Sequence, residues 1–340
     1  MIFDKGRGIT VILQGLNLGS AVNASGGRNF FGTFDQYWHG RFADWLNSTF
    51  QSKTSTLAER MDPARKRGNM PIDSRTLRPK EWKPTCIKAY PRRHLTLNAV
   101  GLSGPGFPAL LDRGEWQQRT QPFLISVAAE SEDPAGITAE LDELSETLLA
   151  QKHGFRAPFV LVLNVTCPNL GTHSQAKVMV QAYAGLESLE AVRVPILLNL
   201  SVLVTPAAAA GIADHGACYG FCLTNTIPFG RLPERIDWEG LFGSVTSPLH
   251  AFGGGGLSGP PLLPLVEEWL KDFRANHSET FPIIAGGGVF SVEDALRLLR
   301  AGADAISLGT VAMYHPFRVQ PIIQAVNQFC LVRDRREQNT

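Results

Sequence analysis

The sequence lacks the features of a membrane protein and of a nucleic-acid-binding protein. No stretch approaches the roughly 18 consecutive apolar residues that would cross a bilayer. Residues 1–20 contain no hydrophobic region that ends in an evident secretory cleavage site. The 32 Lys and Arg residues nearly cancel the 31 Asp and Glu residues, which leaves a net charge of +1. Since neither sign dominates, the overall field attracts neither phosphate polymers nor anionic lipids. We therefore expect a cytoplasmic protein that binds no nucleic acid and no membrane.

Cysteine and histidine give no sign of a disulfide framework or a metal site. The five cysteines are odd in number and lack the paired CxxC spacing of structural zinc sites. The histidines show no metal-ligand spacing, so no metal is predicted. The residues considered are Cys86, Cys167, Cys218, Cys222, Cys330, His94, His153, His173, His215 and His250.

Short apolar runs alternate with helical patterns along the chain. Residues 138–154 and 291–302 have helical patterns, and we predict Thr138 and Ser291 as their N-caps. Buried strands separated by helices pair in parallel, and eight such units close into a (β/α)8 TIM barrel. An open doubly wound sheet shows the same alternation and remains an alternative. The predicted strands are residues 20–25, 48–53, 122–128, 159–165, 195–201, 219–225, 281–286 and 304–309.

The length and composition fit one such barrel. The chain has 340 residues, of which 44% are hydrophobic and 19% charged, and a barrel takes about 250 residues plus insertions. We predict a single domain over residues 1–340. Residues 60–93 are rich in Pro, Arg and Lys without sustained periodicity, so we predict a long irregular loop or lid there. Residues 253–256 are four consecutive glycines, which permit close backbone approaches.

Polar residues follow the ends of the predicted strands. In a barrel the functional residues lie on the face formed by the carboxyl ends of the strands. We therefore expect these side chains to share one face. They are Asn23, Ser25, Lys53, Asn164, Cys167, Asn199, Asn225, Thr226 and the glycines at 286–288.

The C-terminal part of the chain contains a predicted phosphate site. The glycines at 286–288 lead into the helix that opens at Ser291, so bare backbone N–H groups are available to an anion. Gly309 and Thr310 follow the next strand and supply a second set of donors at the same place. The alternative is that the glycines serve only tight turns. That alternative accounts for one turn more easily than for two.

The segment from Asn164 to Asn169 is the main candidate for chemistry. Asn164 ends a predicted buried strand, and Thr166, Cys167 and Asn169 lie in a turn that Pro168 makes rigid. A thiol takes up a proton where its surroundings favour the thiolate, and carboxamides bind planar polar ligands. A buried core cysteine is the alternative. The two neighbouring asparagines favour a catalytic base, and we predict that the other four cysteines are structural.

Together these residues resemble the dihydroorotate dehydrogenases, in the version whose base is a cysteine. The cysteine and the lack of an amphipathic N-terminal extension resemble the soluble class rather than the membrane-associated, quinone-reducing class. Seven blocks occur in the family's order: Asn23-Ala24-Ser25-Gly26; Lys53-Thr54-Ser55-Thr56-Leu57 with Gly68-Asn69; Asn98-Ala99-Val100-Gly101-Leu102; Asn164 to Asn169; Leu223-Thr224-Asn225-Thr226; Gly255-Gly256-Leu257-Ser258-Gly259; and the glycine-rich phosphate segment.

The resemblance implies an FMN-dependent barrel that oxidises dihydroorotate to orotate in de novo pyrimidine biosynthesis. Cys167 would take the C5 proton while a hydride leaves C6 for flavin N5. Lys53 would lie beside both the flavin and the substrate carboxylate. The pyrimidine would be held by Asn98, Gly101, Leu102, Asn164, Asn169, Asn225 and Thr226. The cofactor would be held by Ala24, Ser25, Lys53, Asn164, Asn199, Ser258, Gly259, Gly287, Gly288, Gly309 and Thr310.

The resemblance also bears on partners. Members of the soluble class pass electrons to fumarate, or to NAD through a subunit that carries FAD and an iron–sulfur cluster. We expect a homodimer, with such an electron-transfer subunit as a further partner.

The sequence departs from the family at Asn199, where the family usually has a lysine near flavin N1 and O2. A carboxamide brings no charge to an anionic reduced flavin, so we expect a changed flavin potential, substrate or acceptor. Ser103-Gly104-Pro105 replaces a frequent second asparagine, and the stretch between Asn69 and Asn98 is longer than usual. Two other functions stay open: a flavin oxidoreductase for another pyrimidine or enone, and a non-catalytic FMN- or phosphate-binding barrel.

Four of the candidate residues also have simpler roles open to them. Lys53 lies in a polar stretch and could be a solvated surface lysine. Asn98 and Asn225 could hydrogen-bond their own loops. Ser25 could cap a turn.

Overall fold

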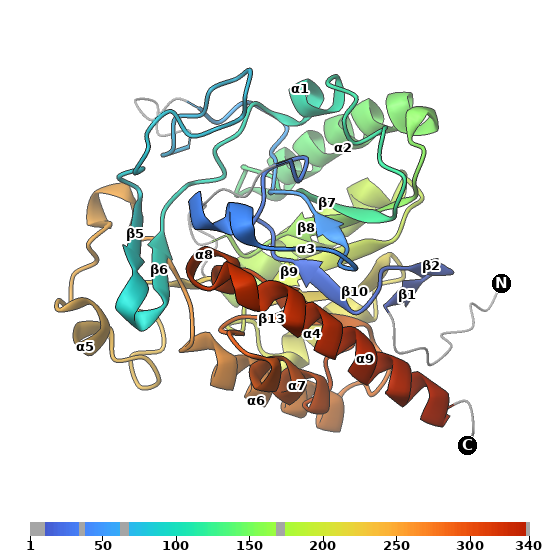
Figure 1. Ribbon diagram of the computed structural model, residues 1–340. Coiled ribbons are helices and arrows are strands. Elements are labelled where there is room, and N and C mark those ends of the chain that lie inside the picture. The colour runs from blue at the N-terminus through green and yellow to red at the C-terminus, as the bar shows by residue number, and fades with distance from the viewer. Residues whose placement is uncertain (1–10, 34–37, 62–67, 168–173, 338–340) are drawn as a thin grey trace.

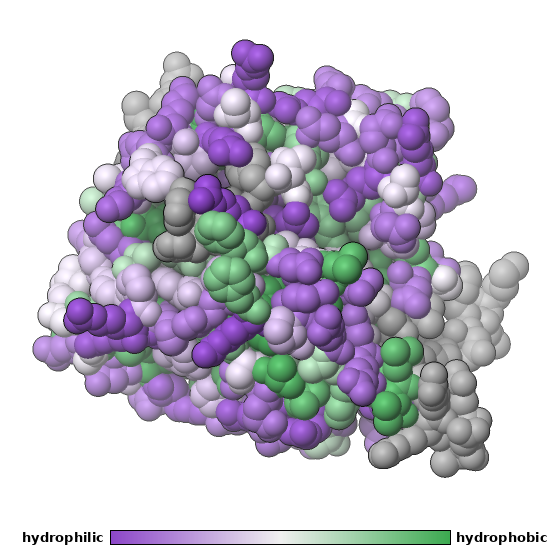
Figure 2. Space-filling model, viewed as in Figure 1, coloured by the Kyte–Doolittle hydropathy of each residue, from purple (hydrophilic) through white to green (hydrophobic). Residues whose placement is uncertain are grey.

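The computed structural model describes residues 11–33, 38–61, 68–167 and 174–337. Its helices surround a central sheet, and α9 crosses the front of the molecule in Figure 1. Among the described residues, no helix is both long and apolar enough to span a membrane. The face in Figure 2 is mostly hydrophilic, with apolar residues in small separate groups.

Eight parallel strands form the barrel, in the order β3-β14-β13-β10-β9-β8-β7-β4. A parallel bridge between Val22 and Thr49 joins the two ends of the sheet, so the barrel closes. Each of the eight predicted segments overlaps one of these strands, which confirms the TIM barrel and excludes the open sheet. The strands are β3 (Ala21–Asn23), β4 (Phe50–Gln51), β7 (Phe123–Val127), β8 (Phe159–Asn164), β9 (Ile196–Leu200), β10 (Cys218–Leu223), β13 (Ile283–Gly286) and β14 (Ala305–Leu308).

Helices cover the outside of the barrel (Figure 1). The longer ones are α2 (Pro134–Gln151), α3 (Gln175–Glu190), α4 (Pro206–Ala213), α6 (Leu262–Asn276), α7 (Val292–Arg300) and α9 (Val319–Glu337). The short ones are α1 (Phe107–Leu111), α5 (Trp238–Phe242) and α8 (Thr310–Tyr314). Single 3-10 turns occur at η1 (Trp38–Phe42), η3 (Pro91–Arg93), η4 (Lys152–Gly154), η6 (His250–Phe252) and η7 (Pro316–Arg318).

The two helices predicted from the sequence are α2 and α7, and one of their predicted caps is wrong. The N-cap of α2 is Asp133, whose carboxylate accepts a hydrogen bond from Gly136 N. Pro134 then occupies the first helical position, which its fixed φ suits, so the helix begins before Thr138. Ser291 caps α7 as predicted, because its Oγ accepts from Asp294 N at 3.1 Å.

Side chains of the barrel strands alternate between two apolar clusters. Phe123, Ile125 and Val127 of β7 face the helices, whereas Leu124 faces the barrel interior. This period of two is the one expected for strands. The interior cluster also contains Leu13, which belongs to the hairpin of β1 (Ile12–Leu13) and β2 (Leu16–Asn17). This hairpin, which the sequence did not predict, packs against the starts of the strands and leaves their carboxyl ends to form the site.

A second, antiparallel sheet lies beside the barrel at the left of Figure 1. Its order is β11 (Ile227–Pro228), β12 (Gly256–Ser258), β6 (Leu95–Asn98) and β5 (Ile87–Tyr90). The prediction of an irregular loop over 60–93 is therefore wrong at its C-terminal end, where β5 and η3 lie. β5 is an edge strand with two exposed central residues, so it carries no periodic burial signal. Residues 62–67 of this segment lie outside the described residues.

Asn23 joins the two ends of the barrel sheet. Its Nδ2 donates to Gln51 O at 2.8 Å, and its Oδ1 accepts from Gln51 N at 3.0 Å. The side chain is buried. One carboxamide therefore replaces a stretch of regular ladder between β3 and β4.

We predict that Asn23→Ala lowers the free energy of unfolding by about 1–3 kcal/mol, because it leaves buried polar groups of Gln51 unsatisfied. Urea unfolding followed by circular dichroism measures the change. Asn276→Ala, on the exposed face of α6, is the matched control and should stay within about 0.5 kcal/mol of the wild type. Equal stability of the two variants would contradict this role for Asn23.

Candidate active site

A cavity of about 210 Å³ opens at the carboxyl ends of the barrel strands. Every predicted site residue that the structure describes lines it, and Asn169 lies outside the described residues. The structure therefore brings these residues together around one cavity, whereas Asn23, which we expected on the same face, is not among the lining residues. The lining residues among them are Ala24, Ser25, Lys53, Asn98, Gly101, Leu102, Asn164, Cys167, Asn199, Asn225, Thr226, Ser258, Gly259, Gly287, Gly288, Gly309 and Thr310.

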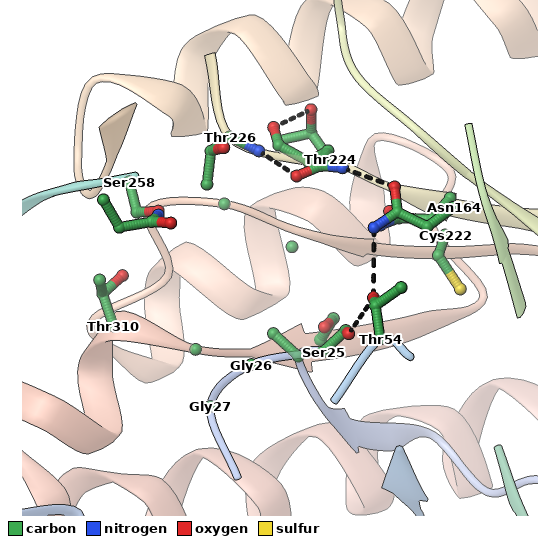
Figure 3. Close-up of a pocket in the computed structure, with 18 of the residues that line it drawn as sticks. Ser25, Gly26, Gly27, Thr54, Asn164, Cys222, Thr224, Thr226, Ser258 and Thr310 are labelled. Carbon is green, nitrogen blue, oxygen red and sulfur yellow. Dashed lines mark hydrogen bonds between the residues drawn. The ribbon is translucent and has the colours of Figure 1, made fainter. Parts of the chain in front are cut away.

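A chain of hydrogen bonds crosses the cavity wall (Figure 3). Thr54 Oγ1 lies 3.0 Å from Ser25 Oγ and accepts from Asn164 Nδ2 at 3.2 Å. Asn225 Nδ2 donates to Asn164 Oδ1 at 2.9 Å. Asn225 Oδ1 accepts from Thr226 N at 2.8 Å. These bonds fix the amide orientation of both asparagines, so the polar edge offered to a ligand is set before binding.

The structure shows which hydrogen bonds Ser25, Asn225 and Asn98 make. Ser25 bonds Ser52 O and Thr54, so it joins β3 to the segment after β4 instead of capping its own turn. Asn225 does bond its own loop, but it also holds Asn164. Asn98 Nδ2 reaches Gly256 O on the neighbouring strand β12, at 3.5 Å.

Lys53 is a buried cation, not a solvated surface lysine. Its side chain is 5% exposed, and its Nζ donates to Ser103 O at 2.6 Å. The Phe30 ring centroid lies 5.1 Å from Nζ. Burial lowers the pKa of Lys53 to about 7, and the nearby Cys86 opposes part of that shift. Among the residues that the structure describes, Lys53 forms no ion pair with a carboxylate, and a buried charge is costly unless it is paired.

The Lys53 side chain and Arg60 hold the loop that follows β6. Arg60 Nε donates to Gly101 O at 2.8 Å, and its guanidinium forms an ion pair with Glu130. Gly101 and Leu102 both have left-handed backbone conformations, with φ of 70° and 56°. Because leucine rarely adopts this conformation, the surrounding contacts must hold the loop in place. Asn69, in the segment predicted as a lid, adds a bond from Nδ2 to Ala99 O at 2.6 Å.

The glycine turns after β13 and β14 form a cradle of bare backbone. Gly287 and Gly288 have φ of 113° and 76°. A Cβ at Gly288 would lie 2.9 Å from both Gly259 O and Leu263 N. A Cβ at Gly286 would lie 2.3 Å from Ser307 O. Gly309 and Thr310 follow β14 and line the same cavity, so backbone groups after two neighbouring strands are available to an anion.

Some lining residues were missed, and Cys222 is one of them. Cys222, which we predicted to be structural, is buried in the interior apolar cluster, and it also lies beside Asn199 in the β9–β10 register and lines the cavity. Burial raises the pKa of its thiol to about 12, so the group stays neutral. Phe221 and Leu223 belong to the cluster that faces the helices. Because side chains alternate along a strand, this pattern could have predicted that Cys222, which lies between them, faces the barrel interior. The other lining residues not predicted as site residues are Gly26, Gly27, Gln51, Thr54, Val100, Leu223, Thr224, Leu262, Val289 and Ser307.

A TIM barrel with a glycine cradle, ordered carboxamides and a buried lysine at its strand ends is the architecture of a cofactor-dependent barrel enzyme. Comparison with known families makes this specific. The dihydroorotate dehydrogenase family matches residues 43–330. The chain belongs to this family, whose members are oxidoreductases that bind a flavin.

Individual relatives support the assignment of this chain to the family. The chain is 30% identical over 267 residues to the catalytic subunit of dihydroorotate dehydrogenase B (NAD(+)) from Streptococcus pneumoniae R6, covering 76% of this chain and 78% of that protein. It is 31% identical over 235 residues to the protein of the same name from Bacillus caldolyticus, covering 67% and 68%. The solved structure of Eimeria tenella DHODH in complex with ferulenol has the same fold. Its TM-score is 0.66 at 18% identity, with 94% of this chain and 83% of that chain covered.

The glycine cradle generates a prediction about flavin retention. We expect Gly288→Ala to lose most of its bound flavin, because the added Cβ would strain a left-handed residue and push into Gly259 O. The absorbance ratio at 450 and 280 nm of purified protein measures flavin content. Gly216→Ala, where a Cβ meets nothing within 4 Å, is the control and should keep the wild-type ratio. Full flavin content in Gly288→Ala would contradict the cradle.

Proposed function

We propose that this chain is an FMN-dependent dihydroorotate dehydrogenase that oxidises dihydroorotate to orotate in de novo pyrimidine biosynthesis. The observation that carries the proposal is that Cys167, Lys53 and the ordered asparagines line the same cavity as the glycine cradle. Membership of the dihydroorotate dehydrogenase family supports the same reaction. We further propose that residues 1–340 work as a single FMN-binding barrel domain, in the cytoplasm.

The lining residues fit FMN. Gly287, Gly288, Gly309 and Thr310 would hold the phosphate, since they line the cavity where β13 and β14 end and can offer backbone N–H groups to an anion. Ala24, Ser25, Ser258 and Gly259 would contact the ring system and its tail. When bound, the flavin supplies the acceptor for the hydride that leaves the substrate.

The substrate would lie on the carboxamide side of the cavity. Asn164 and Asn225 are already oriented by their mutual hydrogen bond, so they can bind the imide edge of a pyrimidine without reorganising. Asn98, Gly101, Leu102, Asn169 and Thr226 would complete this contact. Lys53 would bind the carboxylate of the substrate, because it is the one Lys or Arg among the described residues that line the cavity.

Cys167 would act as the general base that takes the C5 proton. Its side chain is 5% exposed and lies on the cavity wall in the turn after β8. A buried position keeps water away from the reacting carbon, so a positioned thiolate can take the proton there.

We predict that Cys167→Ala retains its flavin and binds orotate but reduces the flavin about 10²–10⁴ times more slowly, the usual contribution of a general base. Anaerobic stopped-flow mixing with dihydroorotate, followed at 450 nm, measures the rate. Cys330→Ala removes a buried thiol outside the cavity and should reduce at the wild-type rate. Undiminished reduction in Cys167→Ala removes the thiol from the mechanism, and a failure of dihydroorotate to bleach the wild type overturns the proposed function.

The electron acceptor would be reached through a partner. The curated relatives named above are catalytic subunits of NAD(+)-linked enzymes. This supports NAD as the final acceptor and a separate electron-transfer subunit as partner, with the chain itself forming a homodimer. Fumarate remains the alternative acceptor, and reoxidation rates with each acceptor distinguish them.

Asn199 favours a second candidate function, a flavin oxidoreductase that acts on another pyrimidine or an enone. Asn199 lines the cavity at the end of β9, and its register neighbour across β10 is the neutral Cys222. These two described side chains therefore offer no charge to an anionic reduced flavin.

We predict that Asn199→Lys raises the midpoint potential of the bound flavin by on the order of 30 mV, which is about 1.4 kcal/mol for a two-electron couple. The added cation would stabilise the reduced form, and spectroelectrochemical titration measures the shift. Asn276→Lys adds the same charge on the exposed face of α6 and should leave the potential unchanged. An unchanged or lower midpoint potential in Asn199→Lys would show that a side chain at position 199 does not stabilise the reduced flavin.

A further inference from the structure

The hydrogen-bond chain on the cavity wall ends in two backbone groups of opposite kind. At one end Thr226 N donates to Asn225 Oδ1 at 2.8 Å, and at the other Ser25 Oγ donates to Ser52 O at 3.2 Å. A backbone N–H can only donate, and a backbone carbonyl can only accept. The bonds between these ends can therefore run in one direction only. The members of the hydrogen-bond chain, in order, are Thr226, Asn225, Asn164, Thr54, Ser25 and Ser52.

The donor end fixes both carboxamides. Because Asn225 Oδ1 faces Thr226 N, the Asn225 nitrogen is the atom that faces Asn164, and it donates to Asn164 Oδ1 at 2.9 Å. The nitrogen of Asn164 then faces Thr54 Oγ1 at 3.2 Å. Turning either amide over would place two donors or two acceptors against each other. Thr54 therefore receives a hydrogen from Asn164.

The acceptor end fixes the hydroxyl groups. The single hydrogen of Ser25 goes to Ser52 O, so the serine oxygen must accept in its 3.0 Å contact with Thr54 Oγ1. This contact uses the one hydrogen of Thr54. Thr54 must then also accept in its 2.8 Å contact with Ser126 Oγ. The hydrogen and both lone pairs of the Thr54 hydroxyl are therefore engaged, on a side chain that is buried.

Thr54 is the link at which the two halves of the cavity meet. Figure 3 shows it between Ser25, on the side proposed for the flavin, and Asn164, on the side proposed for the pyrimidine. Every member of the hydrogen-bond chain donates to the next one towards Ser52 O, so each bond polarises its neighbour. Loss of the Thr54 hydroxyl would break the hydrogen-bond chain in the middle and remove the buried acceptor of Asn164 Nδ2.

We propose that Thr54 is a positioning residue that locks the amide of Asn164 in one orientation for the pyrimidine. Counted over the described residues, the locked amide keeps one N–H and one oxygen lone pair for a ligand. These two groups match a ring edge on which an N–H adjoins a carbonyl, as in dihydroorotate and orotate. The proposal rests on the proposed function, because it takes the ligand to be the substrate or the product.

The lock affects binding more than chemistry. With the Thr54 hydroxyl in place, the Asn164 amide is ordered before the ligand arrives, so binding does not have to order it. The proposed base, Cys167, is not a member of the hydrogen-bond chain. A change at Thr54 should therefore weaken ligand affinity while the rate of proton and hydride transfer in the filled site changes little.

The test measures the orotate affinity of the flavin-loaded enzyme, from the change in flavin absorbance during titration. We expect Thr54→Val, which replaces the hydroxyl by a methyl group, to raise the dissociation constant about tenfold, the equivalent of one buried hydrogen bond. The limiting rate of flavin reduction by saturating dihydroorotate should fall less than about threefold. Thr54→Ser keeps the hydroxyl and should bind orotate within about twofold of the wild type.

Ser126→Ala is the matched control. It removes a buried hydroxyl that bonds the same oxygen of Thr54, but this bond is a side branch that leaves the hydrogen-bond chain intact. Ser126 does not belong to the described residues that line the cavity. Its orotate affinity should stay within about twofold of the wild type, whereas a general loss of packing would weaken both variants alike. Flavin content and circular dichroism verify that each variant is folded.

The results that overturn the proposal are distinct from those that overturn the proposed function. Wild-type affinity in Thr54→Val, equal weakening in Ser126→Ala, or weak binding by a folded Thr54→Ser each overturn this role of Thr54 alone. If Thr54→Val loses its flavin, Thr54→Ala removes the same hydroxyl without the second methyl group and takes its place. Loss of flavin from both assigns Thr54 to the cofactor site and overturns the proposal. A wild-type enzyme that does not bind orotate overturns both.

Discussion

Closure of the barrel is the constraint on which the rest of the site depends. Two strands of only three and two residues, β3 and β4, complete the ring, and the carboxamide of Asn23 supplies two of the bonds between them. Because the ring is closed, the carboxyl ends of all eight strands meet at one mouth. Ser25 and Thr54 can then touch across the same seam, and Asn164 and Asn225 continue the hydrogen-bonded chain from the opposite wall.

The loop after β6 depends on the same arrangement. Lys53 and Arg60 follow β4 in the sequence. Their side chains donate hydrogen bonds to two backbone carbonyl groups of this loop, Ser103 O and Gly101 O. Lys53 therefore holds the wall of the cavity, and it is the one Lys, Arg, Asp or Glu among the described residues that line the cavity. A lysine fixed by a backbone carbonyl keeps its position whether or not an anion is bound, which lowers the cost of ordering it on binding.

Much of this architecture could be predicted from the sequence, because buried parallel strands leave long apolar runs. All eight barrel strands were found in this way. The strands of the second sheet were not, since β12 begins with glycine, β11 ends in proline and β5 is an exposed edge. Polar residues after strand ends stand out in the sequence, and they gave part of the predicted site. Other members of the predicted site were given only by the family resemblance: Ala24, Asn98, Gly101, Leu102, Ser258 and Gly259. Cys222 was missed because its neighbours in sequence are apolar, and only the closed barrel turns it towards the cavity.

The pairing of β6 with β12 joins the two halves of the cavity. Asn98 stands opposite Gly256, and Thr96 stands opposite Ser258. One short ladder thus carries both a contact proposed for the pyrimidine and a contact proposed for the cofactor. Since neighbouring residues of a strand face opposite sides, a slip of one position would turn one of these two side chains out of the cavity. Insertions should therefore accumulate beyond β5, at the free edge, while the length of the β6–β12 ladder stays fixed during evolution.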